Sequence, residues 1–148
     1  MSSDENTSAP RPAVNDWNAT VIADFRAHAG RVGGSFEGAP VLLLHTRGQR
    51  SGAQRVNPMM YLEEDGRVYV FASKGGAHTH PDWYHNLVAD PAVTVERGEE
   101  TYGASAVVVT GARRARLYAE QARRYPGFAE YERKTPRTIP VVELVRAP

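Results

Sequence analysis

The dipeptide Asp65-Gly66 constrains the fold of this chain more than any other feature of its sequence. It separates two candidate strands, 56–62 and 67–73, and this arrangement predicts a β-hairpin with a tight turn. The segment 97–100 is a weaker signal of the same kind. Six strands are expected in all: 41–46, 56–62, 67–73, 92–97, 101–109 and 139–145. Strands joined by hairpins, with no regular alternation of strand and helix, favour a small antiparallel barrel over a parallel sheet.

Three helices are expected to pack outside the barrel. Asn15 is a candidate N-cap for the first, whose apolar residues recur at three- and four-residue spacing until Gly30. Pro81 suits the first turn of the second helix. The third spans 111–125, and its predicted buried stripe is Ala115, Tyr118, Ala122 and Tyr125. In the strand 67–73, alternating residues are apolar on both sides, which predicts that both faces are covered.

The composition limits the class of protein. The chain has 148 residues, enough for one domain, which we place at 15–148 behind a polar tail, 1–14, expected to be disordered. Lys+Arg 18 against Asp+Glu 17 gives a net charge of +1, so no nucleic-acid partner is expected. The absence of cysteine excludes disulfides and thiolate chemistry. The first residues lack the features of a signal peptide, and no apolar run reaches the ~18 residues of a spanning helix, so we expect a cytoplasmic protein.

A glycine-rich, cationic loop follows the apolar run 41–44. It carries Arg50 and Arg55 and no carboxylate, while Gly48 and Gly52 permit a sharp turn and close approach to a ligand. Arginine forks bind phosphate and carboxylate groups through paired hydrogen bonds. The glycine spacing fits neither a Walker loop nor a dinucleotide-binding fingerprint. The loop therefore predicts an anion site without specifying a reaction.

A second loop of the same character lies in the middle of the chain. Ser73 and Lys74 end an expected strand, Gly75 and Gly76 follow, and Trp83 offers a flat aromatic face just beyond. Two cationic, glycine-rich loops in one small barrel favour a single shared ligand site. No metal site is expected, because the nearby histidines match no zinc spacing and are expected in exposed loop positions: His78, His80 and His85.

Four blocks of the sequence resemble the deazaflavin-dependent nitroreductase family of actinobacteria. They are GQRSGAQRVNPMMYL, SKGGAHTHPDWYHNL, DPAVTVERG and RRYPGFAEYERKTPRTIPVVEL, and the resemblance runs from about Phe25 to Leu144. It implies a mainly β fold, a six-stranded antiparallel split β-barrel of the FMN-binding split-barrel-like type. It also implies the cofactor, coenzyme F420, an 8-hydroxy-5-deazaflavin that carries a phosphodiester and an oligoglutamate tail.

The same resemblance implies roles for individual residues. Those expected to hold the phosphate and the tail, in loops shaped by Gly48 and Gly52, are Gln49, Arg50, Ser51, Arg55 and Lys74. Those expected to line the deazaflavin are Asn57, Pro58, Met60, Ser73, Gly75, Gly76 and Trp83. The implied activity is hydride transfer from the reduced cofactor to a quinone-like or nitro-bearing acceptor, for which the protein supplies binding and orientation.

The acceptor side is implied to lie near Tyr125 and Tyr131, which with Ser73 are expected to hydrogen-bond or protonate the acceptor. Together with Phe128 the tyrosines stand at three-residue spacing, which can place all three rings on one helical face. Phe128 replaces a tyrosine of some family members and cannot donate a proton, which leaves the reduction of bicyclic nitroimidazoles open. Two alternatives are an FMN- or haem-binding split-barrel protein and a non-catalytic carrier of F420.

The segment 111–125 is strongly basic, with Glu120 as its one acidic residue. A solvated helix face is the default interpretation of such a segment. The alternative is peripheral contact with an anionic membrane, since quinones reside in membranes. The sequence does not specify an oligomeric state.

Overall fold

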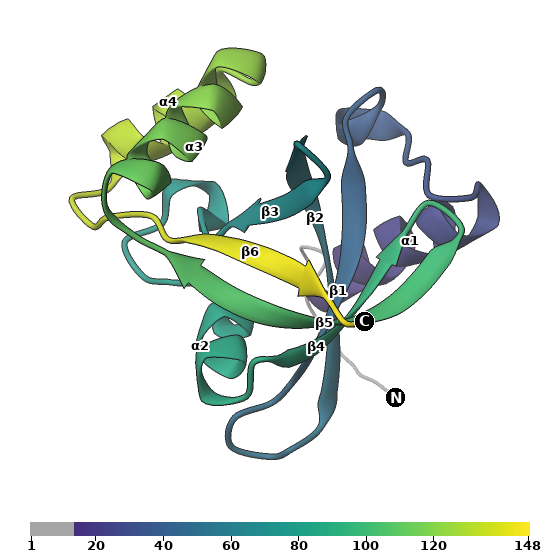
Figure 1. Ribbon diagram of the computed structural model, residues 1–148. Coiled ribbons are helices and arrows are strands. Elements are labelled where there is room, and N and C mark those ends of the chain that lie inside the picture. The colour runs from purple at the N-terminus through teal and green to yellow at the C-terminus, as the bar shows by residue number, and fades with distance from the viewer. Residues whose placement is uncertain (1–13) are drawn as a thin grey trace, which may run out of the picture.

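The computed structural model describes residues 14–148. Its elements are, in order, α1 (Val14–Ala27), the 3-10 helix η1 (Gly34–Phe36), β1 (Val41–Arg47), β2 (Gln54–Glu64), β3 (Arg67–Phe71), the 3-10 helix η2 (Lys74–Gly76), α2 (Asp82–Ala89), β4 (Ala92–Arg97), β5 (Glu100–Val109), α3 (Gly111–Arg124), α4 (Gly127–Lys134) and β6 (Val141–Arg146). The strands close into an antiparallel barrel in the order β1-β2-β3-β6-β5-β4, with the helices outside it (Figure 1). The predicted fold class is therefore confirmed.

Asp65 and Gly66 form the tight turn predicted between β2 and β3. Both have a positive φ, 55° and 77°, and Glu64 pairs with Arg67 across the turn. Positive φ at both central positions gives a turn whose twist matches that of the hairpin strands. The segment 97–100, predicted less strongly, also forms a hairpin turn, which joins β4 to β5. Local turn chemistry thus sets the register of these two strand pairs.

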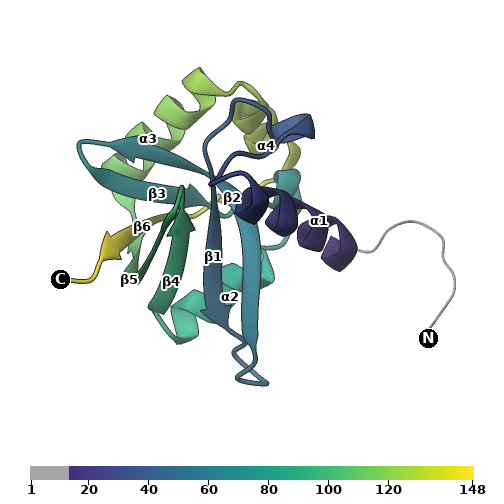
Figure 2. The same cartoon turned by 90° about the vertical axis from the view of Figure 1, so that its right-hand side faces the viewer.

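Both faces of β3 are buried, as predicted. Its inward residues, Val68 and Val70, belong to the barrel interior, to which α2 contributes Trp83. Its outward residues, Tyr69 and Phe71, pack in a second apolar cluster with side chains of α3 and α4. A third cluster joins α1 to β1 and β2, and Figure 2 shows α1 lying alongside these strands.

The pairing between β2 and β3 ends early. The ladder runs from Glu64 and Arg67 only as far as Tyr61 and Val70. The remaining part of β2, from Gln54 to Met60, pairs with β1 on one side only. One edge of this long strand is therefore free of a strand partner at the end of the barrel that carries the β1–β2 loop.

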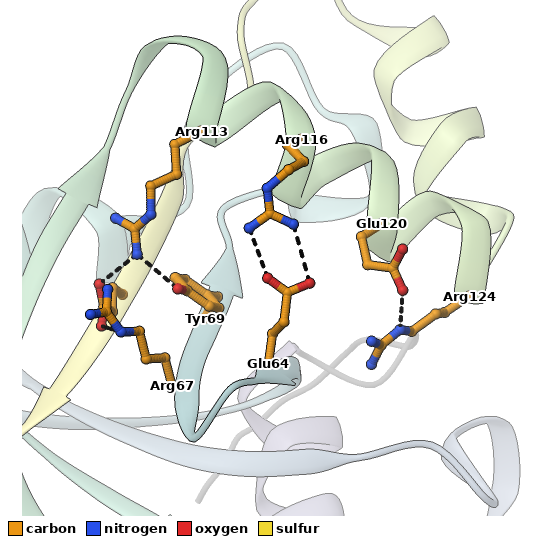
Figure 3. Close-up of polar contacts among 8 residues, drawn as sticks. Glu64, Arg67, Tyr69, Arg113, Arg116, Glu120 and Arg124 are labelled. Atoms are coloured by element: carbon orange, nitrogen blue, oxygen red, sulfur yellow. Dashed lines mark hydrogen bonds and ion pairs between the residues drawn. The ribbon is translucent and has the colours of Figure 1, made fainter.

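Helix α3 is tied to the barrel by ion pairs (Figure 3). Arg113 donates to the Tyr69 hydroxyl at 2.8 Å and to Glu143 at 3.1 Å. Arg116 makes two hydrogen bonds to Glu64 at the β2–β3 hairpin. Within the helix, Arg123 and Arg124 both pair with Glu120. The basic face predicted from the sequence is therefore largely neutralised by carboxylates of the same molecule.

Two details of the helices differ from the sequence-based expectation. Helix α1 begins at Val14, so Asn15 lies inside it rather than capping it; residues 1–13 of the predicted tail lie outside the described part. Ala115 is exposed, and the buried side of α3 is centred instead on Leu117, Tyr118 and Gln121, because this side must face both the sheet and α4. Within residues 14–148 no helix has the length and hydropathy needed to cross a bilayer.

Gln121 provides a test of this packing. Its side chain is fully buried, and neither amide atom has a hydrogen-bond partner among the described residues. Because an unsatisfied buried amide costs about 1–3 kcal/mol, we expect Gln121→Met to raise the free energy of unfolding by an amount of that order, measured by urea denaturation. Gln54→Met is the control and should bring no gain, since the Gln54 amide bonds to His45. A destabilised Gln121→Met protein would show that ordered water satisfies the amide.

Candidate functional site

The β1–β2 loop is closed by its own hydrogen bonds. The Gly48 amide donates to the Ala53 carbonyl at 2.7 Å, and the Gly52 amide donates to the Gly48 carbonyl at 2.8 Å. The Ser51 hydroxyl accepts from the Ala53 amide at 3.1 Å. A Cβ on Gly48 would stand 2.9 Å from the Ser51 hydroxyl oxygen and 3.3 Å from the Ala53 carbonyl oxygen, so a larger residue would force this part of the loop to adjust. The loop is a compact, preformed turn that exposes its cationic side chains.

This loop forms one wall of a cleft of about 640 Å³ whose other wall is the start of α2. The loop and α2 lie side by side at the foot of the barrel in both ribbon views (Figures 1 and 2). The residues that line the cleft are Gly48, Gln49, Arg50, Ser51, Arg55, Asn57, Asp82, Trp83, His85 and Asn86. The structure thus brings the first predicted loop together with Trp83, which the sequence places nearly thirty residues further on.

Arg50 and Arg55 differ from most arginines of residues 14–148. Eleven other arginines lie within ion-pair distance of a carboxylate. Arg50 and Arg55 are exposed, and their side chains have neither a hydrogen bond nor an ion pair within this part of the chain. Two unpaired guanidinium groups in one cleft create a field that attracts anions, and their hydrogen-bond forks remain available.

Asn86 is a site residue that the sequence analysis missed. Its side-chain oxygen accepts from the Gln49 amide at 3.0 Å, and its side-chain nitrogen donates to the Thr46 hydroxyl at 3.2 Å. Asn86 and Thr46 are both buried. The asparagine therefore fastens the cationic loop to α2 and to β1. No local signal marks this role, because the partners are 37 and 40 residues away in sequence.

The second predicted loop lies at the end of β3, beside α4. Ser73 is mostly buried, and the next three residues, Lys74 to Gly76, all have positive φ. A Cβ on Gly76 would lie 3.1 Å from the Tyr131 carbonyl oxygen, so this glycine allows α4 to approach. None of these residues lines the 640 Å³ cleft. The two loops therefore occupy neighbouring parts of the same barrel end rather than one cavity.

The unpaired edge of β2 lies between the two loops. The β2–β3 register pairs Tyr61 with Val70, and its continuation would set Pro58 opposite Ser73. Asn57 lines the cleft, and Pro58 is half-buried on the same strand. Met60 is partly buried against two of the apolar clusters. A flat ligand bound along this edge would reach from the cleft to the Ser73 loop.

The aromatic residues near α4 are arranged differently from the prediction. Tyr125 follows α3 and precedes α4, so the three rings do not share one helical face. Phe128 is buried, and its ring packs 5.7 Å from that of Phe71. The Tyr118 hydroxyl donates to the Phe128 carbonyl at 2.7 Å, whereas the hydroxyls of Tyr125 and Tyr131 have no partner among the described residues. The last two, both half-buried, are the phenols still available to a ligand.

Trp83 and His80 are less exposed than predicted. Trp83 is only 9% exposed, so most of its ring is packed in the barrel core and only a small part lines the cleft. His80 is half-buried, 4.9 Å from the Tyr84 ring. Burial, with smaller contributions from Arg137 and His85, lowers the pKa of His80 below its usual value, so its ring is neutral at pH 7. Among residues 14–148 no group of three histidines or carboxylates is placed to hold a metal.

Asn86→Ala tests whether this asparagine holds the cationic loop. We expect the free energy of unfolding to fall by about 1–3 kcal/mol, because the buried Thr46 hydroxyl loses its partner. Amide hydrogen exchange at Gln49 should become faster. Thr46→Val is the control: it should lower stability while leaving exchange at Gln49 unchanged, since the Gln49–Asn86 bond remains. Equal exchange rates in both variants would remove Asn86 from this role.

Comparisons with known proteins agree with the resemblance inferred from the four sequence blocks. Residues 17–146 match the family described as F420H(2)-dependent quinone reductase. An F420H(2)-dependent quinone reductase of Mycobacterium tuberculosis strain H37Rv is 37% identical over 131 residues, which cover 84% of this chain and 86% of that protein. A second, putative F420H(2)-dependent quinone reductase of the same strain is 35% identical over 115 residues, covering 77% of this chain and 97% of that protein.

Solved structures support the same relationship. An F420-H2 dependent reductase, FDR-A, superposes with a TM-score of 0.65 at 39% identity, covering 71% of this chain and 93% of that one. A structure described as a domain-swapped dimer has a TM-score of 0.67 at 34% identity, covering 89% of this chain and 99% of that one. A haem storage protein from Vibrio cholerae, at 16% identity, shares the fold alone. The chain belongs to the F420H2-dependent quinone reductase family, and it is an F420-dependent oxidoreductase built on the split barrel.

Proposed function

We propose that the cleft between the β1–β2 loop and α2 binds the phosphodiester and oligoglutamate tail of F420. The observation that carries this proposal is the pair of unpaired guanidinium groups, Arg50 and Arg55, in a cleft large enough for such a tail. Gln49 and Ser51 line the same cleft and add polar contacts. The donor set fits a polyanion, because arginine forks match phosphate and carboxylate geometry.

In the same proposal the deazaflavin lies along the unpaired edge of β2. The ring would extend from Asn57 and Trp83 past Pro58 and Met60 towards Gly75 and Gly76. Lys74 is exposed, and its ammonium group makes a 3.2 Å hydrogen bond to Thr79 but has no carboxylate partner within residues 14–148. Its charge therefore remains available to an anionic part of the cofactor.

The reduced deazaflavin supplies a hydride when it is bound. The protein's part is to orient ring and acceptor, to exclude water and to deliver a proton. Ser73, Tyr125 and Tyr131 are the proposed donors, because each hydroxyl lacks a partner among the described residues. A quinone that gains a hydride and one proton becomes a hydroquinone, so one such donor suffices. A nitro-bearing compound is a second proposed acceptor.

The place of action is also a proposal. We propose a cytoplasmic protein that meets quinones at the inner face of the membrane. The ion pairs of α3 limit this contact, because carboxylates within the molecule offset the charges of Arg113, Arg116 and Arg124. Contact with anionic lipid is therefore expected to be weak and transient.

A cofactor titration followed by turnover tests the proposed function. Trp17 is exposed and would dominate the fluorescence, so the titration uses the Trp17→Phe protein, in which Trp83 is the single reporter. We expect F420 to quench this fluorescence, whereas FMN and haem should not. Reduction of menadione by F420H2 would separate an enzyme from a carrier, and NADH or NADPH should not replace F420H2. Quenching by FMN with none by F420 would contradict the proposal.

Arg50→Ala and Arg55→Ala test the tail site. Each should weaken F420 binding by about 1.5–3 kcal/mol without unfolding the protein, since each removes one charge-assisted contact. The loss should shrink as salt approaches about 1 M. Arg133→Ala is the control, because Arg133 is exposed and pairs only with Glu130 on its own helix. Unchanged affinity at low salt in both cleft variants would place the tail elsewhere.

Tyr125→Phe and Tyr131→Phe test the acceptor side. Both proteins should bind F420 normally, yet a positioned proton donor contributes about 10²–10⁴-fold, so nitro reduction should slow by a factor in that range. Menadione reduction should slow less, because a quinone can take its proton from water. Tyr118→Phe is the control: its hydroxyl serves the Phe128 carbonyl, so stability should fall while turnover per folded molecule stays constant. Small, equal effects of both tyrosine changes on both acceptors would point to Ser73.

A further inference from the structure

Arg137 lies in the segment between α4 and β6 and contacts a part of the chain about sixty residues earlier. Its guanidinium donates to the carbonyls of Ala72 at 3.1 Å, Ser73 at 2.9 Å and Ala77 at 2.8 Å. It also donates to Nδ1 of His80 at 2.8 Å. One side chain thus holds the backbone on both sides of the turn from Ser73 to Gly76.

The charge of Arg137 has no carboxylate partner among the described residues. Burial lowers the pKa of Arg137, as expected for a guanidinium that has lost part of its hydration. Backbone carbonyl dipoles and the neutral His80 ring replace that hydration. Most arginines of residues 14–148 pair with a glutamate or aspartate, so Arg137 is set apart by its partners, which are backbone carbonyls and an imidazole.

The turn that Arg137 holds has an unusual backbone. Lys74, Gly75 and Gly76 have φ values of 48°, 62° and 86°. Glycine adopts this region freely, but for Lys74 it is a strained conformation that the surroundings must enforce. Inside the turn, the Gly76 amide donates to the Ser73 carbonyl and the Ala77 amide to the Lys74 carbonyl. Arg137 adds bonds to the carbonyls on either side of these two.

We propose that Arg137 is a positioning residue for the cofactor site. By fixing the carbonyls that precede and follow the turn, it keeps Lys74 in its left-handed conformation and sets the places of the Ser73 hydroxyl and the Lys74 ammonium. The role toward the cofactor rests on the proposed function above. The clamp, by which we mean the four hydrogen bonds that Arg137 donates to the turn and its flanks, rests on the structure alone. An arginine is required, because a lysine ammonium is a single point donor that cannot span three carbonyls and an imidazole.

Arg137→Met and Arg137→Lys test the clamp, and Arg114→Met is the matched control. Arg114 is also half-buried, and it donates to the Ile139 carbonyl without touching the turn. In both Arg137 variants we expect amide hydrogen exchange at Gly76 and Ala77 to rise about tenfold or more. Arg114→Met should lower the melting temperature and leave exchange at these two amides unchanged. If Arg137→Met does not fold, Arg137→Lys carries the test.

Binding provides the functional half of the test. The dissociation constant for F420 should rise about tenfold in the Arg137 variants, while KM for menadione changes by less than about twofold. Unchanged exchange at Gly76 and Ala77 would overturn the clamp. Faster exchange with unchanged F420 affinity and kcat would reduce Arg137 to a structural residue and overturn its positioning role. If the wild-type protein failed to bind F420, the proposed function and the role toward the cofactor would both fall, and the exchange rates alone would still decide whether Arg137 shapes the turn.

Discussion

The early end of the pairing between β2 and β3 is the constraint on which the candidate site depends. Six strands close into one barrel, yet seven residues of β2 pair on one side only. Unpaired backbone groups need a partner, either water or a ligand. The glycine-rich loops lie at the two borders of this open edge, and α2 and α4 flank them. A fully paired β2 would fill this edge with β3 and leave no room for a ligand between the loops.

The arginines of residues 14–148 fall into two groups: most pair with a carboxylate of the same molecule, and a few have no such partner. Arg116 and Glu64 join α3 to the β2–β3 hairpin, and most other arginines of residues 14–148 form comparable pairs. In the cleft, Arg50 and Arg55 lack such partners. The sequence predicted both groups from the same kind of signal, an arginine-rich segment, and could not tell them apart. The difference depends on which carboxylates the fold brings near, and this information is in the tertiary structure.

Features set by local chemistry were predicted well. Asp65-Gly66 gave the hairpin because few dipeptides tolerate positive φ at both positions. The glycines also marked where both loops turn, whereas the role of these loops as a ligand site stays a prediction. The residues that hold these loops, Asn86 and Arg137, were missed because each acts across 37 or more residues and belongs to no motif. Phe128 was misplaced for a related reason: spacing indicated a shared helical face, but the chain breaks between α3 and α4.

A comparison of the two ends of the barrel supports the proposal that the ligand binds at the end with the unpaired edge of β2. At the end away from the cleft, Arg97 pairs with Glu63 and lies over the Tyr61 ring, while Arg146 pairs with Glu100. These charges are satisfied within the protein, so a ligand there would have to displace existing contacts. At the cleft end, by contrast, unpaired cations, a strained turn and a free strand edge occur together. Each is unfavourable in isolation, and the apolar clusters around β3 supply the stability that allows all three. A bound polyanion with a flat ring would pair with the cations and cover the free strand edge. It would also contact the turn that Arg137 holds in place.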